Sequence, residues 1–180
     1  MSILQLPHTA FSRWVDRSVT LIGRWTSYLW IILLGVIVTN VLMRYVLDQG
    51  RIEFEELQWH LYSAGFLLGL SYAQQANAHV RVDLLYERLS LRHQAWIELY
   101  GIVLLLLPFI LLILIYSVPF VMASYAISER SQAPGGLGLR WLAKSLLPLG
   151  FSLLLLTTLA RLSRIWVYLF PKYGGYTDAS

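Results

Sequence analysis

The sequence predicts an all-α integral membrane protein with four transmembrane helices, on the strength of three observations. Of its 180 residues, 57% are hydrophobic and 13% are charged, whereas a soluble domain contains about 25% charged residues. The charged residues leave four long stretches without Asp, Glu, Lys or Arg. The seven Trp and eleven Tyr supply rings that favour the interface between lipid and water. This composition excludes a disordered chain and argues against a water-soluble globule.

Each charge-free stretch can be compared with the length needed to cross a bilayer, about 20 apolar residues. The four stretches comprise residues 25–43, 57–80, 99–128 and 145–160. The third is longer than one perpendicular crossing requires, so we expect it to tilt or to kink at Pro108 or Pro119. The fourth is short, and snorkelling by Lys144 and Arg161 would extend it to a full crossing. Four spans between residues 25 and 160 are therefore the expected membrane domain.

Two segments flank this predicted domain. Residues 1–24 are expected to form an interfacial segment, and residues 161–180 a cytoplasmic tail. One helical face of the first segment contains Phe11, Trp14, Val15, Ser18 and Ile22. That spacing is typical of a short helix lying on the membrane surface. A frayed, positively charged leader is the alternative, and the sequence does not separate the two.

The orientation is predicted by the distribution of Lys and Arg. Nine of them lie in the N-terminal segment, in the connection after the second stretch and in the C-terminal tail, against five in the other two connections. Because cytoplasmic flanks are enriched in Lys and Arg, both termini are expected in the cytoplasm. The same distribution argues against a nucleic-acid-binding surface, since the basic residues do not form one patch.

The second stretch contains three small residues at helical spacing, Gly65, Gly69 and Ala73. Such a stripe allows another helix to approach closely. Packing within the four-helix unit is the favoured explanation, and an interface with a second membrane protein is the alternative.

The sequence contains few residues in a pattern that indicates catalysis or cofactor binding. With no cysteine there is no disulfide, thiol nucleophile or thiolate metal site. His60 and His79 would lie about 28 Å apart along one helix, and no other stretch contains a histidine to pair with them across a haem. No Asp, Glu, Lys or Arg lies within the four stretches, which argues against a self-sufficient ion-coupled transporter. Neither an enzyme nor a cofactor is expected.

The two predicted external connections have opposite charge. The first, residues 44–56, sums to −2, and the second, residues 129–144, sums to +2. Complementary charge steers association between proteins. Four residues are the candidate docking contacts for an external partner: Glu53, Glu55, Arg130 and Arg140.

Several motifs resemble one family. These are Glu55-Glu56-Leu57, Gly69, the run from His79 to Leu84 (His-Val-Arg-Val-Asp-Leu), and the blocks Ala133-Pro134-Gly135-Gly136-Leu137, Arg140-Trp141-Leu142-Ala143-Lys144-Ser145 and Leu147-Pro148-Leu149-Gly150-Phe151. Together they resemble the small membrane subunit of TRAP transporters (tripartite ATP-independent periplasmic transporters), the DctQ-like family. The resemblance spans residues 39–159, and Gly138 stands where the family pattern leads us to expect proline.

The resemblance implies a function that composition does not show. Such a subunit would act as a stator for a large membrane subunit, which carries the substrate and sodium sites and moves as an elevator. It would also supply part of the docking surface for a periplasmic substrate-binding protein that delivers an organic acid. The expected location is the bacterial inner membrane, in contact with the lipid bilayer.

Within the resembling motif, His79, Arg81 and Asp83 are expected to fix the turn from the second helix onto the cytoplasmic surface, with Asp83 as an N-cap. Their predicted role is structural rather than substrate-binding. Two other classes of function stay open at this point. One is a membrane-anchor subunit of a redox enzyme, and the other is an autonomous small transporter.

Overall fold

The computed structural model describes residues 6–78 and 89–171, and this part of the chain is helical with short connections. The elements are α1 (Ala10–Val46), α2 (Ile52–Gln75), α4 (Leu91–Gly101), η1 (Ile102–Leu106), α5 (Leu107–Ala126) and α6 (Arg140–Leu169). The segments α4, η1 and α5 form one helix of 36 residues, Leu91–Ala126. Four long helices therefore make up the described fold, as the sequence predicts.

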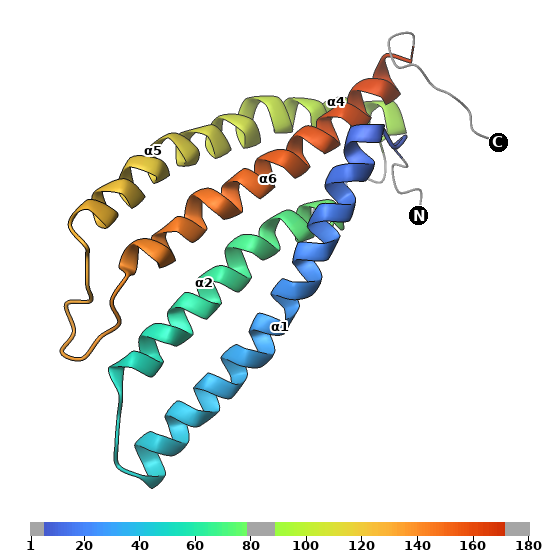
Figure 1. Cartoon of the computed structure of the whole chain (residues 1–180). Coiled ribbons are helices and arrows are strands. Elements are labelled where there is room, and N and C mark those ends of the chain that lie inside the picture. Colours follow the sequence, from blue (N-terminus) through green and yellow to red (C-terminus); the bar gives the residue numbers. More distant parts are fainter. Residues whose placement is uncertain (1–5, 79–88, 172–180) are drawn as a thin grey trace.

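The four long helices lie side by side in a tilted array (Figure 1). In the order α1, α2, α6, α5, each helix packs against the next. The α1–α2 and α5–α6 connections lie together at one end of the array, which we call the loop end. The described parts of the chain nearest the two termini lie at the opposite end, which we call the terminal end.

Three of the four helices are long and apolar enough to cross a membrane: Ala10–Val46, Leu91–Ala126 and Arg140–Leu169. Helix α2 has 24 residues but is not among these three.

Helix α1 crosses residue 24, the expected end of the N-terminal segment. Helix α1 begins at Ala10, where Thr9 caps it by accepting a hydrogen bond from the Ser12 amide, and continues without a break to Val46. Its exposed apolar residues include Phe11 and Trp14, which belong to the face expected to lie on the membrane surface. The buried face consists of Ser12, Val15, Val19, Gly23 and Thr26. These small or β-branched side chains allow α1 to lie close to its neighbours, as Val15 and Val19 do against Ala160.

Helix α6 extends past residue 160, into the segment that the sequence assigns to a tail. Its last turns remain helical because Ile165 and Leu169 are buried against Ala95, Leu99 and Ile102. The third helix contains one π turn at Ile102–Leu106, just before Pro108. A π turn accommodates the backbone near a residue that cannot donate a hydrogen bond. Pro119 lies inside α5, which does not end there.

Candidate functional site

At the loop end, Glu56 holds the connection between α5 and α6 against α2. This side chain is 6% exposed, and its carboxylate accepts hydrogen bonds from the Ser131 hydroxyl and, at 2.6 Å, from the Leu137 backbone amide. Leaving such a carboxylate buried without partners would be costly. The Glu56 contacts therefore fix the position of the connection.

Two glycines make this arrangement possible. Gly135 has a φ of +82°, in the left-handed region, which glycine adopts at low cost. A Cβ atom at Gly136 would lie 2.4 Å from the Ser131 Cβ and 2.9 Å from Glu56 Oε1. The Ala-Pro-Gly-Gly motif thus serves a close approach between the connection and Glu56.

The charge of Glu56 is favoured by its surroundings. The hydrogen bond from Ser131 is the main cause that lowers the pKa of Glu56, and burial opposes it. The Leu137 amide and the neighbouring Arg140 and His60 also act to lower this pKa.

A second acidic residue, Glu129, ties the same connection to the first turns of α6. It forms an ion pair with Lys144, and its other oxygen lies 4.0 Å from the Arg140 guanidinium. The hydrogen bond from Lys144 is the main cause that lowers the pKa of Glu129. The Lys144 ammonium also lies 4.2 Å from the centre of the Phe120 ring, on α5.

The four candidate docking residues all lie at the loop end, in different settings. Glu55 pairs with Arg44 across the α1–α2 connection at 3.7 Å, and both side chains are about half exposed. Arg130 is exposed, whereas Glu53 and Arg140 are partly covered. These residues therefore share one end of the array but not one continuous exposed patch.

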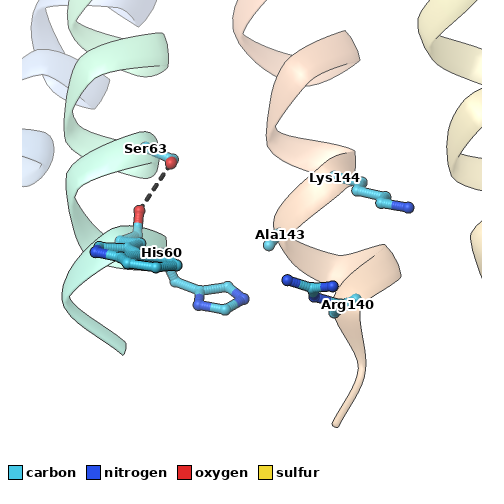
Figure 2. Close-up of a pocket in the computed structure, with 6 residues that line it drawn as sticks. His60, Ser63, Arg140, Ala143 and Lys144 are labelled. Carbon is cyan, nitrogen blue, oxygen red and sulfur yellow. Dashed lines mark hydrogen bonds between the residues drawn. The ribbon is translucent and has the colours of Figure 1, made fainter. Parts of the chain in front are cut away.

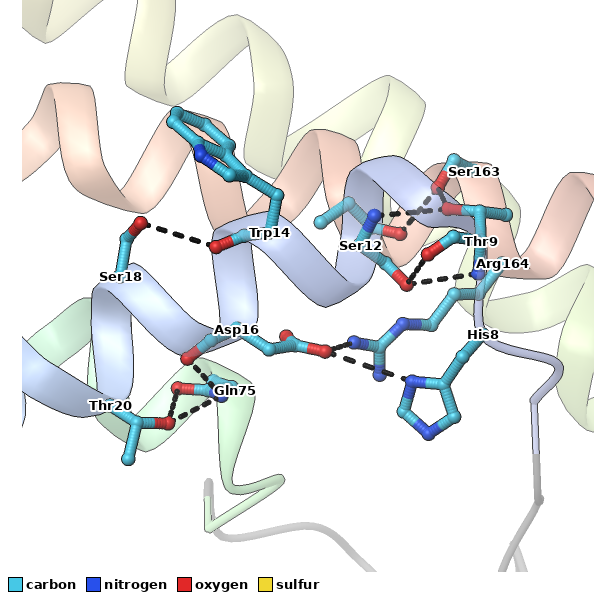
Figure 3. A network of polar contacts seen from close by, with 11 residues as sticks. His8, Thr9, Ser12, Trp14, Asp16, Ser18, Thr20, Gln75, Ser163 and Arg164 are labelled. Atoms are coloured by element: carbon cyan, nitrogen blue, oxygen red, sulfur yellow. Dashed lines mark hydrogen bonds and ion pairs between the residues drawn. The ribbon is translucent and has the colours of Figure 1, made fainter.

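At the terminal end, a polar cluster joins α1, α2 and α6 (Figure 3). Asp16 forms an ion pair with Arg164 of α6 and lies 3.7 Å from the His8 ring. From α2, the Gln75 amide donates hydrogen bonds of 3.0 Å to the Asp16 carbonyl and to the Thr20 hydroxyl. The cluster holds three helices together with side chains that prefer a polar environment.

A second ion pair at this end links α4 to α6. Arg161 donates to Glu98 at 2.6 Å, and the two side chains are 12% and 11% exposed. Sequence reasoning assigned Arg161 and Arg164 only to topology and missed both pairs. The available signal was Asp16, the one acidic residue in the basic segment 1–24.

The small-residue stripe on α2 divides between two surroundings. A Cβ atom at Gly65 would lie 3.2 Å from the Trp30 ring of α1, whereas a Cβ atom at Gly69 would meet nothing within 4 Å. Ala73 is partly exposed. Gly65 thus serves packing within the chain, and the space beside Gly69 is open.

A close contact between α6 and the backbone of α2 uses a glycine that sequence reasoning did not single out for packing. A Cβ atom at Gly150 of α6 would lie 2.8 Å from the backbone oxygen of Leu67 on α2. Gly23 of α1 similarly faces Tyr72 of α2, with only 2.5 Å for a Cβ atom. The motif around Gly150 was noted for its resemblance to the family, and the structure adds its physical role.

The remaining sequence-predicted positions contribute no described site. His79, Arg81 and Asp83 lie outside the described residues. The His60 ring contacts the backbone oxygen of Glu56. Among the residues that the structure describes, no group of three or more His, Cys, Asp or Glu side chains is placed to hold a metal ion.

The fold is that of a multi-pass membrane protein. Its charged residues lie at the two ends of the helix array. The family model for the DctQ component of tripartite ATP-independent periplasmic transporters matches residues 33–167. The chain therefore belongs to this family, as its motifs predict, and it is a transporter component rather than an enzyme. No match was found among curated proteins.

Proposed function

We propose that this chain is the stationary scaffold of its TRAP transporter. In this proposal it holds the large membrane subunit, which moves substrate and sodium, and it offers part of the docking surface for a periplasmic binding protein that delivers an organic acid. Membership of the DctQ family supports the transporter context. The scaffold role is the step we add.

The observation that carries the proposal is the fastening of the array at both ends. Glu56 and Glu129 secure the loop end, and the Asp16–Arg164 and Glu98–Arg161 pairs secure the terminal end. Between these ends, the four charge-free stretches contain no Asp, Glu, Lys or Arg for coupling to an ion gradient. An array fastened in this way suits a part that stays fixed while its partner moves.

Copurification of the native complex tests the proposed partnership. We expect a large, many-span membrane protein to accompany this chain from native membranes in fixed proportion. A chain that purifies alone and remains fully folded would contradict the scaffold role. Liposomes that contain only this chain are expected to show no uptake, and uptake by them would favour an autonomous transporter.

The proposed topology has all four helices crossing the inner membrane, with both termini in the cytoplasm and the loop end in the periplasm. Because the chain has no cysteine, a single introduced thiol reports on one position. Gln132→Cys, at the loop end, should react with a membrane-impermeant maleimide in intact spheroplasts. Leu91→Cys, at the terminal end, should react only after permeabilisation. The reverse pattern would invert the topology.

The proposed docking surface places Glu55 and Arg130 in contact with the binding protein. Charge reversal at either position should weaken substrate uptake in a salt-dependent way, because steering between exposed charges is screened by salt. Reversal of Arg92, an exposed charge at the other end of the array, is the matched control. Equal effects at the two ends would argue against docking at the loop end.

A further inference from the structure

A cavity of about 350 Å³ lies between α2 and α6 near the loop end. Its lining comprises Trp59, His60 and Ser63 from α2, and Arg140, Ala143 and Lys144 from α6. Figure 2 shows the His60 ring and the Arg140 guanidinium directed toward each other across the space between the two helices. None of these lining residues is acidic.

The cavity offers an anion the N–H donors of the Arg140 guanidinium. Its side chain is 37% exposed, and its contact with Glu129 is 4.0 Å long, beyond hydrogen-bond distance. The nearer partner of Glu129 is Lys144, whose ammonium extends toward α5 (Figure 2). Within the described part of the chain, the Arg140 guanidinium makes no hydrogen bond, so its planar set of donors is available to an anion in the cavity.

His60 completes the cavity from the α2 side. Its Nδ1 lies at 2.5 Å from the Glu56 backbone oxygen. A carbonyl oxygen can only accept, so Nδ1 carries the proton. The other nitrogen of the neutral ring is then an acceptor, so His60 borders the cavity without donating to an anion. The N-terminus of α6 adds its positive dipole end, because Leu139 at the N-cap provides no side-chain hydrogen bond.

The position of the cavity along the helices indicates the kind of anion. Trp59, His60 and Ser63 open the charge-free stretch 57–80, and Arg140 to Lys144 immediately precede the stretch 145–160. The cavity therefore lies at the level where apolar helix gives way to charged flank, which is the level of lipid headgroups. Trp59 is 66% exposed, as expected for an aromatic ring at the membrane interface.

We propose that this cavity binds the phosphate group of an anionic phospholipid. Arg140 receives the phosphate oxygens through its fork of donors, His60 lies opposite, and Trp59 borders the headgroup. The volume falls within the range of about 300–1,000 Å³ found for small-molecule sites. The proposal requires only that α2 and α6 lie in the bilayer, and it is independent of the scaffold role.

Native mass spectrometry of the purified full chain tests the proposal with phosphatidylglycerol and phosphatidylcholine as probes. We expect one tightly retained phosphatidylglycerol and preference over phosphatidylcholine. Arg140→Gln should weaken phosphatidylglycerol binding by about tenfold, as expected for loss of a charge-assisted hydrogen bond. Arg130→Gln removes an exposed charge outside the cavity and should leave binding unchanged.

A second variant tests the cavity without changing its charge, and a soluble anion tests whether the ligand is a lipid. Ala143→Leu fills the cavity without changing charge and should also abolish retention of the lipid, so the test survives if Arg140→Gln fails to fold. Inorganic phosphate at millimolar concentration should not displace the lipid. Displacement by inorganic phosphate would assign the site to a soluble anion, and equal retention of both lipids or insensitivity to both variants would also overturn the proposal.

Discussion

At the scale of single residues, Glu56 is the side chain on which the loop end depends most. It is buried, it lies near the N-terminus of α2, and it accepts from both Ser131 and the Leu137 amide of a connection far along the chain. Its neighbour Glu55 is exposed and pairs only with Arg44 among the described residues. Two adjacent glutamates thus have different roles, and substitution can separate them.

Glu56→Gln is expected to loosen the α5–α6 connection. The amide has one acceptor oxygen instead of two, so its NH₂ group would face either the Ser131 hydroxyl or the Leu137 N–H. Hydrogen exchange of the Leu137 amide should accelerate by roughly an order of magnitude. Glu55→Gln is the matched control, and an equal acceleration in both variants would contradict a special role for Glu56.

The pH dependence of this connection follows from the direction of the pKa shifts. The pKa values of Glu56 and Glu129 are lowered from 4.5 in the folded chain. Both carboxylates therefore contribute stability that is present above pH 4.5 and is lost as pH falls through their folded pKa values. Leu137 exchange, corrected for its intrinsic rate, should be constant from neutral pH to about pH 5 and rise in stronger acid. In Glu56→Gln this acid-induced rise should be smaller, and a rise already complete near pH 6 would contradict this assignment.

At the scale of elements, ion pairs and glycines determine how the helices pack. The Arg161–Glu98 pair joins α6 to α4, next to the cluster of Ala95, Leu99, Ile102, Ile165 and Leu169. Its carboxylate and guanidinium are both nearly covered. The pair therefore fixes the terminal end in a way that exposed ion pairs do not.

Arg161→Met is expected to destabilise the chain by about 2–4 kcal/mol, because it leaves a covered carboxylate without its main partner. The double variant Glu98→Gln/Arg161→Met should recover part of that loss. Thermal unfolding in detergent, followed by the helical circular dichroism signal, measures both effects. Additive losses in the double variant would show that the two residues are not coupled.

Gly150 and Gly69 form a matched pair for testing helix contact. Gly150→Ala would force a Cβ atom against the Leu67 backbone, whereas Gly69→Ala enters open space. Overpacking of this kind costs about 1–3 kcal/mol. We expect Gly150→Ala to lower the melting temperature of the isolated chain and Gly69→Ala to leave it unchanged or raise it. Equal melting temperatures for the two variants would refute the close α2–α6 contact.

At the scale of the whole molecule, the sequence predicts the four helices better than it predicts their ends and the contacts between them. The four stretches without Asp, Glu, Lys or Arg locate all four long helices, because a helix needs about 20 apolar residues to cross a bilayer. Helices α1 and α6 extend beyond residues 24 and 160 because Val15 and Ile165 find packing partners there. Contacts such as Asp16–Arg164 depend on helices brought together from distant parts of the chain, which local pattern does not encode.

The same limit applies to the candidate site. Motifs identify the family, and the charged connections direct attention to the loop end. They do not distinguish exposed Glu55 from buried Glu56, because that difference arises only when the α5–α6 connection folds over α2. For the same reason Arg140 is a docking candidate by charge, whereas in the fold it faces Glu129 and the cavity.

The central claim is that this chain stays fixed while its partner moves, and a distance measured across the array tests it most directly. Spin labels at Leu47→Cys and Ile127→Cys, both exposed at the loop end, report the separation of α1 and α5 in the intact transporter. We predict one distance distribution that does not change when sodium, substrate and the binding protein are added, while a label pair that spans this chain and the large subunit does change. A substrate-dependent shift in the Leu47–Ile127 distribution would contradict the claim.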